Sequence, residues 1–324
     1  MKRLLKKKEF TLAVSLVALC LIVSLRAPGF LAPKTLNSIL NDTCALIIVS
    51  LGQFLVILIG GIDLSVASTI AFTGMATALM NQALPGIPAW TYLPIATGMG
   101  ALLGSASGAL VAFGGLPPLI ATLGTMSIYR GIVFVMSSGA WVTTHEMTRD
   151  FLSIPNTGVL GLSSMTWMAL ACVAAVAVLM RLSASGRNVY AYGGNKTAAL
   201  FAGVDSRKVE MLVFTVSGAL SGLAGILWVS RYGMAHSETA AGFELQTVAA
   251  CVLGGVSMSG GSGTVLGVVI GALFFGTINN ALTVVRFSPF YQMAIQGFII
   301  LFAVVSNMLI DRRNQMRLVA RRKI

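Results

Sequence analysis

The chain has 324 residues, of which 56% are hydrophobic and 10% are charged, and its formal net charge is +12. Soluble domains carry about 25% charged residues, so this composition excludes an ordinary soluble protein and indicates a membrane protein. The positive charge would suit a nucleic-acid-binding protein if it covered one surface. Instead it is concentrated in three short segments, and we expect no nucleic-acid partner.

The three basic segments are the N-terminus, residues 181–210 and the tail from Asp311, and together they account for the whole surplus. Lys and Arg accumulate in short cytoplasmic loops and ends of membrane proteins. We therefore expect all three segments on the cytoplasmic side. The polybasic tail would also suit binding to anionic membrane lipid or to nucleic acid, but a topology signal is the simpler explanation.

A membrane-spanning helix needs about 20 largely apolar residues, and the sequence contains ten candidates. The first follows a basic N-terminus but lacks a convincing cleavage site, so it is interpreted as a retained helix. An even number of spans returns both termini to the same side, in agreement with their shared charge. The candidates are Phe10–Leu25, Asp42–Gly61, Leu64–Met80, Tyr92–Phe113, Leu119–Ser137, Met165–Leu182, Val209–Val229, Phe243–Val256, Thr264–Val285 and Tyr291–Ile310.

Two of these candidates are weak, because Leu119–Ser137 contains Arg130 and Phe243–Val256 is short. Either would suit a broken or re-entrant helix. Small residues allow close helix packing in lipid, so the regularly spaced glycines predict helix contacts: Gly100, Gly104, Gly108, Gly218, Gly222, Gly225, Gly263, Gly267 and Gly271. The four cysteines show no CxxC spacing, so no metal site or disulfide framework is expected.

One motif recurs within the chain. GGIDLSVAS, residues 60–68, and GGVSMSGGS, residues 254–262, each lie between two apolar segments. Polar and glycine residues at membrane depth interrupt a helix, and paired interruptions in two halves are typical of a transporter's central site. The span count implies parallel copies, although the orientation is left open.

Several polar residues within the apolar spans are candidates for a solute pathway. Asp63 is the clearest, because an ionisable residue at membrane depth is costly and usually lines a cavity or has a partner. Arg130 is one candidate partner; alternatively Asp63 caps the helix that begins at Leu64. Asn279 and Asn280 would hydrogen-bond either a sugar hydroxyl or a neighbouring helix. The other candidates are Gln53, Ser65, Thr122, Thr125, Gln246, Gln292 and Gln296.

Residues 183–210 form the only long polar stretch inside the chain, with a short helical pattern at its centre. Asn195 is a favourable N-cap and Gly203 a favourable left-handed stop. Between them Ala198, Leu200 and Phe201, followed by Val204, offer a small apolar surface. Such a helix would either lie at the lipid interface or contact a cytoplasmic partner.

Four motifs resemble the permease subunits of bacterial ribose-type ABC importers: GGIDLSVAS, and the segments of residues 116–131, 186–209 and 243–282. The resemblance implies one domain of about ten helices with broken segments, located in the bacterial inner membrane. It also implies a second permease subunit, the same or related, separate cytoplasmic ABC ATPase subunits and a periplasmic solute-binding protein. The short helix resembles the coupling helix that contacts the ATPase, formed here by Asn195, Ala198, Ala199, Leu200, Phe201, Gly203, Val204 and Asp205.

ATP chemistry is expected on the partner subunits. The sequence lacks a GxxxxGK[ST] phosphate loop, so no cofactor is expected in this chain and ATP with magnesium would bind to the ATPase. The predicted cargo is a sugar or sugar-like solute such as ribose, rhamnose or autoinducer-2. An ion-coupled secondary transporter is the alternative. An intramembrane enzyme would need a catalytic constellation, and His145 and His236 belong to none.

Overall fold

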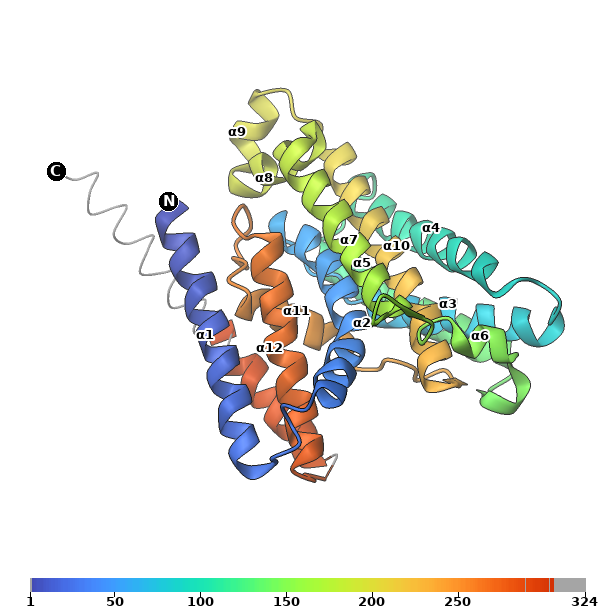
Figure 1. Ribbon diagram of the computed structural model, residues 1–324. Coiled ribbons are helices and arrows are strands. Elements are labelled where there is room, and N and C mark those ends of the chain that lie inside the picture. Colours follow the sequence, from blue (N-terminus) through green and yellow to red (C-terminus); the bar gives the residue numbers. More distant parts are fainter. Residues whose placement is uncertain (1, 289, 303, 306–324) are drawn as a thin grey trace.

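The computed structural model describes residues 2–288, 290–302, 304 and 305, which form a helical bundle with two small two-stranded sheets (Figure 1). The elements are α1 (Lys2–Arg26), α2 (Pro33–Leu58), α3 (Val66–Ala83), η1 (Ala89–Thr91), α4 (Tyr92–Ala112), α5 (Pro118–Ser137), β1 (Val142–Thr143), η2 (Thr144–Glu146), α6 (Arg149–Ser153), β2 (Gly158–Val159), β3 (Leu162–Ser163), α7 (Ser164–Leu182), α8 (Ala184–Gly194), α9 (Lys196–Phe201), α10 (Ser206–Tyr232), β4 (Met234–Ala235), α11 (Phe243–Leu253) and α12 (Val265–Val284). A further apolar helix covers Phe290–Phe302.

Seven of the described helices are long and apolar enough to cross a membrane, so the protein is an all-α, multi-pass membrane protein. Proline opens two of them, α2 and α5, where its fixed φ suits the first helical turn and its missing N–H costs nothing. The seven are α1, α2, α4, α5, α7, α10 and α12.

The other three predicted spans also contain helices, but each differs from a simple crossing. The α3 helix has 18 residues and buries several hydroxyl side chains, including Ser68, Thr69 and Thr73. The α11 helix has 11 residues and is therefore roughly 16 Å long, about half of a 30 Å hydrocarbon core. The last predicted span, to Ile310, lies partly outside the described residues. The count of ten spans therefore stays a prediction.

One boundary and one alternative differ from the sequence interpretation. The α2 helix begins at Pro33, well before the predicted Asp42, because proline suits the first helical position. Further along the helix, Asn41 accepts hydrogen bonds from Ser163 and from Thr166 (2.9 Å). The α5 helix is continuous through Arg130 and is not re-entrant. The Arg130 guanidinium reaches the end of the bundle, where it donates to the carbonyl oxygens of Ser237 and Thr239.

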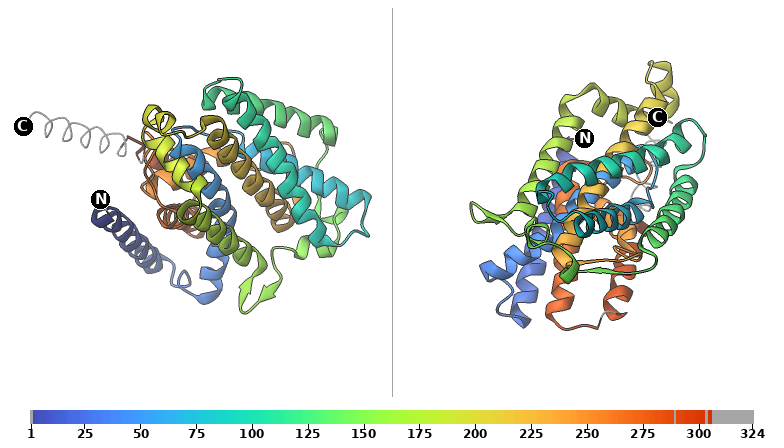
Figure 2. Two further views of the ribbon diagram at one scale, coloured as in Figure 1. Left: turned by 90° about the horizontal axis from the view of Figure 1, so that it is seen from above. Right: turned by 90° about the vertical axis from the view of Figure 1, so that its right-hand side faces the viewer.

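The core of the bundle is built on α2, α3 and α10. Most of α2 after Asn41 is buried, and α10 packs against α2, α3 and α4. In contrast, α1 lies on the outside of the bundle beside α12, and only 6% of its apolar window is buried (Figure 2). Its exposed apolar side chains are suited to contact with lipid.

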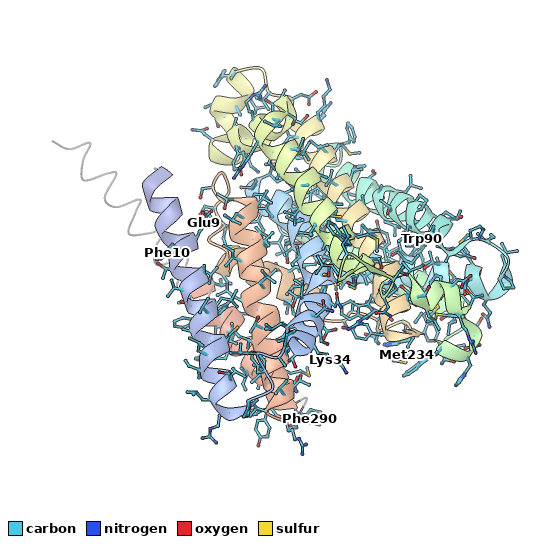
Figure 3. The ribbon with its side chains drawn as sticks, in the orientation of Figure 1. Glu9, Phe10, Lys34, Trp90, Met234 and Phe290 are labelled. Atoms are coloured by element: carbon cyan, nitrogen blue, oxygen red, sulfur yellow. The ribbon has the colours of Figure 1, made fainter. Side chains whose placement is uncertain are left out.

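The two ends of the bundle are distinct. The carboxylate of Glu9 on α1 accepts a hydrogen bond from Thr264, and Tyr190 on α8 donates to the carbonyl of Gly263 (2.9 Å). The start of α1, the start of α12 and the α8 helix therefore meet at one end. Figure 3 shows Glu9 at this end and Lys34 and Phe290 at the opposite end. The N-terminal segment and the polar segment thus lie at the same end of the bundle. The third basic segment, from Asp311, lies outside the described residues, and the cytoplasmic side of all three stays a prediction.

Glycines bring α4 and α10 into backbone contact, as their spacing predicts. A Cβ added at Gly104 would lie 2.3 Å from the carbonyl oxygen of Phe214, and one added at Gly222 would lie 2.3 Å from that of Ala96. Real side chains do not approach so closely, so these positions require glycine. The two helices therefore pack through backbone atoms, which maximises van der Waals contact in lipid.

We expect Gly104→Val to destabilise the protein by about 3 kcal/mol or more, because the added methyl groups force α4 away from α10. The measurement is the thermal midpoint of the purified protein in detergent. Gly98→Val is the matched control, because a Cβ at Gly98 on the same helix meets nothing within 4 Å. Equal thermal midpoints for the two variants would show that the α4–α10 contact does not contribute to the stability of the protein.

Candidate functional site

The polar segment contains two helices, whereas the sequence analysis predicted one. The additional helix, α8, begins after Ser183, whose Oγ accepts a hydrogen bond from the Gly186 N–H (2.9 Å). Val189 and Tyr192 form its buried face. A serine N-cap followed by apolar residues three positions apart is a helix signal, so α8 was recognisable in the sequence.

The α9 helix has the predicted boundaries. The Asn195 Oδ1 accepts from the Ala198 N–H (2.9 Å), and Gly203 takes a left-handed conformation at φ +81°. The N–H groups of Gly203 and Val204 donate to Leu200 and Ala199 (both 3.0 Å), which is the Schellman pattern that ends a helix. These bonds hold a helix of only six residues in place.

The residues of α9 divide between an outer and an inner face. Phe201 is 91% exposed and Leu200 is 53% exposed, and Ala198 is exposed beside them. Ala199 is buried and Val204 is half-buried against the core. The predicted apolar surface is therefore present, and its outermost part is Leu200 and Phe201. Exposed apolar side chains at a tip are typical of a contact surface.

Asp205 has a structural role as the N-cap of α10. Its Oδ1 accepts from the N–H groups of Arg207 (3.0 Å) and Lys208 (3.3 Å). These hydrogen bonds lower the pKa of Asp205, because they favour the charged carboxylate. Asp205 therefore fixes the direction in which the chain leaves α9.

The α8 helix is fastened to the bundle by its own tyrosines and glycine. Tyr192 donates to the Glu210 carboxylate (2.6 Å); burial, with this bond, raises the pKa of Tyr192. Gly193 lies against the backbone of two interhelical loops, because an added Cβ would be 1.7 Å from Leu58 O and 2.8 Å from Gly261 N. The polar segment is thus in direct contact with the chain breaks.

Both copies of the repeated motif form breaks, one between α2 and α3 and the other between α11 and α12. The Gly261 N–H of the second motif donates to Leu58 O, at the end of α2 (2.8 Å). The junction therefore joins the end of α2 to the loop between α11 and α12. Backbone pairing between the loops satisfies groups that a break leaves open.

Asp63 is a buried anchor within the first break. Its Oδ1 accepts from the Ser65 N–H (2.9 Å) and Oγ (2.6 Å), and its Oδ2 accepts from Ser217 Oγ on α10 (2.9 Å). With its amide oriented to satisfy both groups, Gln53 bonds to the N–H and carbonyl of Asp63. Asp63 organises the entry to α3, and Arg130 bonds elsewhere.

The α5 helix closes the other side of this break. Thr122 Oγ1 donates to Ile62 O (3.2 Å), and Thr125 accepts from Ser107 on α4 (3.0 Å). The structure thus brings Gln53, Asp63, Ser65 and Thr122 together, with Thr125 one turn away. All five are buried, and Arg130 is apart from them.

Asn279 and Asn280 belong to a different place, a pocket of about 280 Å³ between α2, α10, α11 and α12. Asn280 Nδ2 donates within its own helix, to Gly276 O (3.1 Å). Asn279 Oδ1 is buried and has no hydrogen-bond partner among the described residues. Neither side chain is seen to bond to another helix in the described part of the chain. The pocket is lined by Asp42, Thr43, Leu46, Trp228, Tyr232, Phe243, Gln246, Gly276, Asn279, Asn280, Thr283 and Gln292.

Paired helix breaks within a bundle of apolar helices are typical of membrane transport proteins. The chain belongs to the family described as "Branched-chain amino acid transport system / permease component", whose model matches residues 35–304. It is therefore a transport subunit and not an enzyme.

Three curated relatives are similar over almost the whole chain. A ribose import permease protein, RbsC, from Haemophilus influenzae is 38% identical over 94% of this chain and 93% of its own length. The D-allose transport system permease protein AlsC from Escherichia coli is 34% identical, with 94% and 93% covered. The autoinducer 2 import system permease protein LsrC from Klebsiella pneumoniae is 34% identical, with 94% and 88% covered. No solved structure matches the chain.

We expect Asp63→Ala to lower stability by about 3 to 5 kcal/mol, because it leaves buried donors of Ser65 and Ser217 without an acceptor. Asp63→Asn should be milder, since it keeps one acceptor oxygen. Thermal midpoints in detergent give the comparison, with the exposed Asp150→Ala as control. An Asp63→Ala protein that melts with the wild type would instead favour a role for Asp63 in the solute pathway.

Proposed function

We propose that the chain is the permease subunit of an ATP-driven importer of a sugar or sugar-like solute in the bacterial inner membrane. The similarity to permeases named for ribose, D-allose and autoinducer 2 supports the cargo class. The observation that carries the mechanism is the exposed pair Leu200 and Phe201, held by a capped helix at the basic end of the bundle. Ten membrane crossings, with both termini in the cytoplasm, complete the proposed topology.

In this proposal α9 is the coupling helix. The apolar side chains of Leu200 and Phe201 enter a groove on a separate cytoplasmic ATPase, which binds ATP and magnesium. A second permease subunit completes the pathway, and a periplasmic solute-binding protein delivers the cargo. The Asn195 cap and the left-handed Gly203 keep α9 rigid. A movement of the ATPase therefore displaces α9 as a unit and does not unfold it.

The α8 helix supplies the route from α9 to the membrane. Gly193 lies against Leu58, the last residue of α2 before the first break, and against Gly261, within the second break. A displacement of α8 therefore acts on both breaks together. Packed backbones transmit such shifts because they are not continuously deformable.

We expect Phe201→Asp to reduce ATP-driven uptake by about tenfold or more, because a charged side chain cannot enter an apolar groove. The assay is uptake of labelled D-ribose, D-allose and L-arabinose by vesicles containing the complete importer. Membrane insertion and stability should stay unchanged, since Phe201 is exposed. Leu160→Asp, at an equally exposed site at the other end of α7, is the control.

Unchanged uptake by Phe201→Asp would indicate a lipid-interface helix instead. The same vesicles test the energy source. Uptake driven by an ion gradient without the ATPase would support the alternative of a secondary transporter and contradict the proposal. That alternative needs a titrating carboxylate at membrane depth, whereas Asp63 is held by three hydrogen bonds.

We expect Gly193→Ala to lower uptake per ATP hydrolysed by about tenfold, because a Cβ cannot fit 1.7 Å from Leu58 O and α8 must leave the breaks. Gly194→Ala is the matched control, since a Cβ there meets nothing within 4 Å. The measurement is the ratio of solute transported to phosphate released. Equal ratios in the two variants would exclude α8 as the transmitting element.

A further inference from the structure

We propose that the pocket between α2, α10, α11 and α12 binds a neutral, polyhydroxylated solute of monosaccharide size as it enters the permease. This proposal rests on the proposed import function and adds a binding site and its residues to it. The pocket has a volume of about 280 Å³, close to the lower limit for ligand pockets, which span about 300 to 1,000 Å³. That size suits one small ring and not a larger molecule.

One wall of the pocket is aromatic. The Trp228 ring contacts the Phe243 ring edge-on, with centroids 4.9 Å apart at 80°, and the Tyr232 ring at 5.2 Å. The three rings come from the end of α10 and the start of α11. A continuous aromatic surface offers an apolar platform for the C–H face of a sugar ring, and such rings combine large contact area with defined geometry.

Other residues of the lining offer hydrogen-bonding groups. Asn279 and Asn280 project from α12, Gln246 from α11, and Gln292 from the segment after α12. Asn279 Oδ1 is the informative atom, because it is buried without a partner among the described residues. A buried acceptor without a partner costs free energy, and a donor from a bound solute would satisfy it once the Asn279 amide turns toward the pocket that this residue lines. A solute hydroxyl is such a donor.

The charges at the pocket favour a neutral ligand. Asp42 is the one charged residue of the described lining, and its Oδ1 already bonds to Arg231 Nη2 on α10 (2.9 Å). Arg231 Nη1 also bonds to Asn156 (2.9 Å). A zwitterionic amino acid would need an unpaired cation and an unpaired anion. Amide groups and aromatic rings suit hydroxyl groups and ring carbons instead.

The position of the pocket suits an entry site. Tyr232 is the last residue of α10, whose first turn follows α9, and Asn279 lies near the end of α12, whose first turn contacts Glu9. The pocket therefore lies toward the end of the bundle opposite α8 and α9. If α9 faces the cytoplasm, as proposed, the pocket lies toward the periplasm, where a binding protein would release its cargo.

The test is equilibrium binding of labelled D-ribose, D-allose, L-arabinose and L-leucine to the purified full-length chain in lipid nanodiscs. We expect at least one sugar to bind with a Kd on the order of 1 mM, and L-leucine not to bind. Asn279→Leu should raise that Kd about tenfold, since it removes the acceptor. Trp228→Leu should raise it about fivefold by removing the platform.

Trp90→Leu is the matched control, because Trp90 is exposed and does not line the pocket; its Kd should equal that of the wild type. If Asn279→Leu does not fold, as judged by its thermal midpoint, Trp228→Leu decides alone. Absence of sugar binding, an unchanged Kd in the folded variants, or preferential binding of L-leucine would each overturn the site. ATP-driven sugar uptake by vesicles that contain the complete importer tests the importer function separately, so the two failures are distinguishable.

Discussion

The architecture depends on one constraint: backbone groups inside a bilayer need partners even where a helix is broken. The repeated motif breaks the bundle twice, and the two breaks satisfy each other through the Gly261 N–H and Leu58 O (2.8 Å). Gly193 brings α8 onto the same junction, where only glycine fits. The two breaks and the α8 helix, which belongs to the polar end of the bundle, therefore contact one another through backbone atoms. A displacement of α8 would act directly on both breaks.

The buried polar residues serve two different purposes. Around the first break, Gln53, Asp63, Ser65 and Ser217 bond to one another and are fully committed to structure. Around the pocket, Asn279 leaves an acceptor unused beside the aromatic rings. A hydrogen-bonded network in which every group has a partner makes a protein more rigid. A buried polar group without a partner can instead form a hydrogen bond with a ligand. This contrast separates the candidates that hold the helices from those that are suited to contact a solute.

Glycines allow the helices around these sites to pack closely against each other. Gly100, Gly104, Gly218 and Gly222 bring α4 against α10, and Gly254, Gly267 and Gly271 do the same for α11 and α12. Helices gain no hydrophobic driving force from each other in lipid, so close backbone contact supplies the attraction. Because α10 has Asp205 as its N-cap and Tyr232 as its last residue, this packing also connects the segment that follows α9 to the pocket wall.

The sequence by itself determined the membrane class, the boundaries of α9 and the positions of both breaks, because these follow from local composition, caps and glycines. It also carried the N-cap signal of α8, although only one helix was predicted in that segment, and it left the role of Asp63 open between a partnership with Arg130 and a helix cap. Only the tertiary structure decided that Asp63 bonds to Ser217, that Arg130 bonds to distant carbonyls, and that Asn279 lines the same pocket as aromatic residues of α10 and α11. Those contacts join residues far apart in the chain, and their geometry arises only when the helices pack.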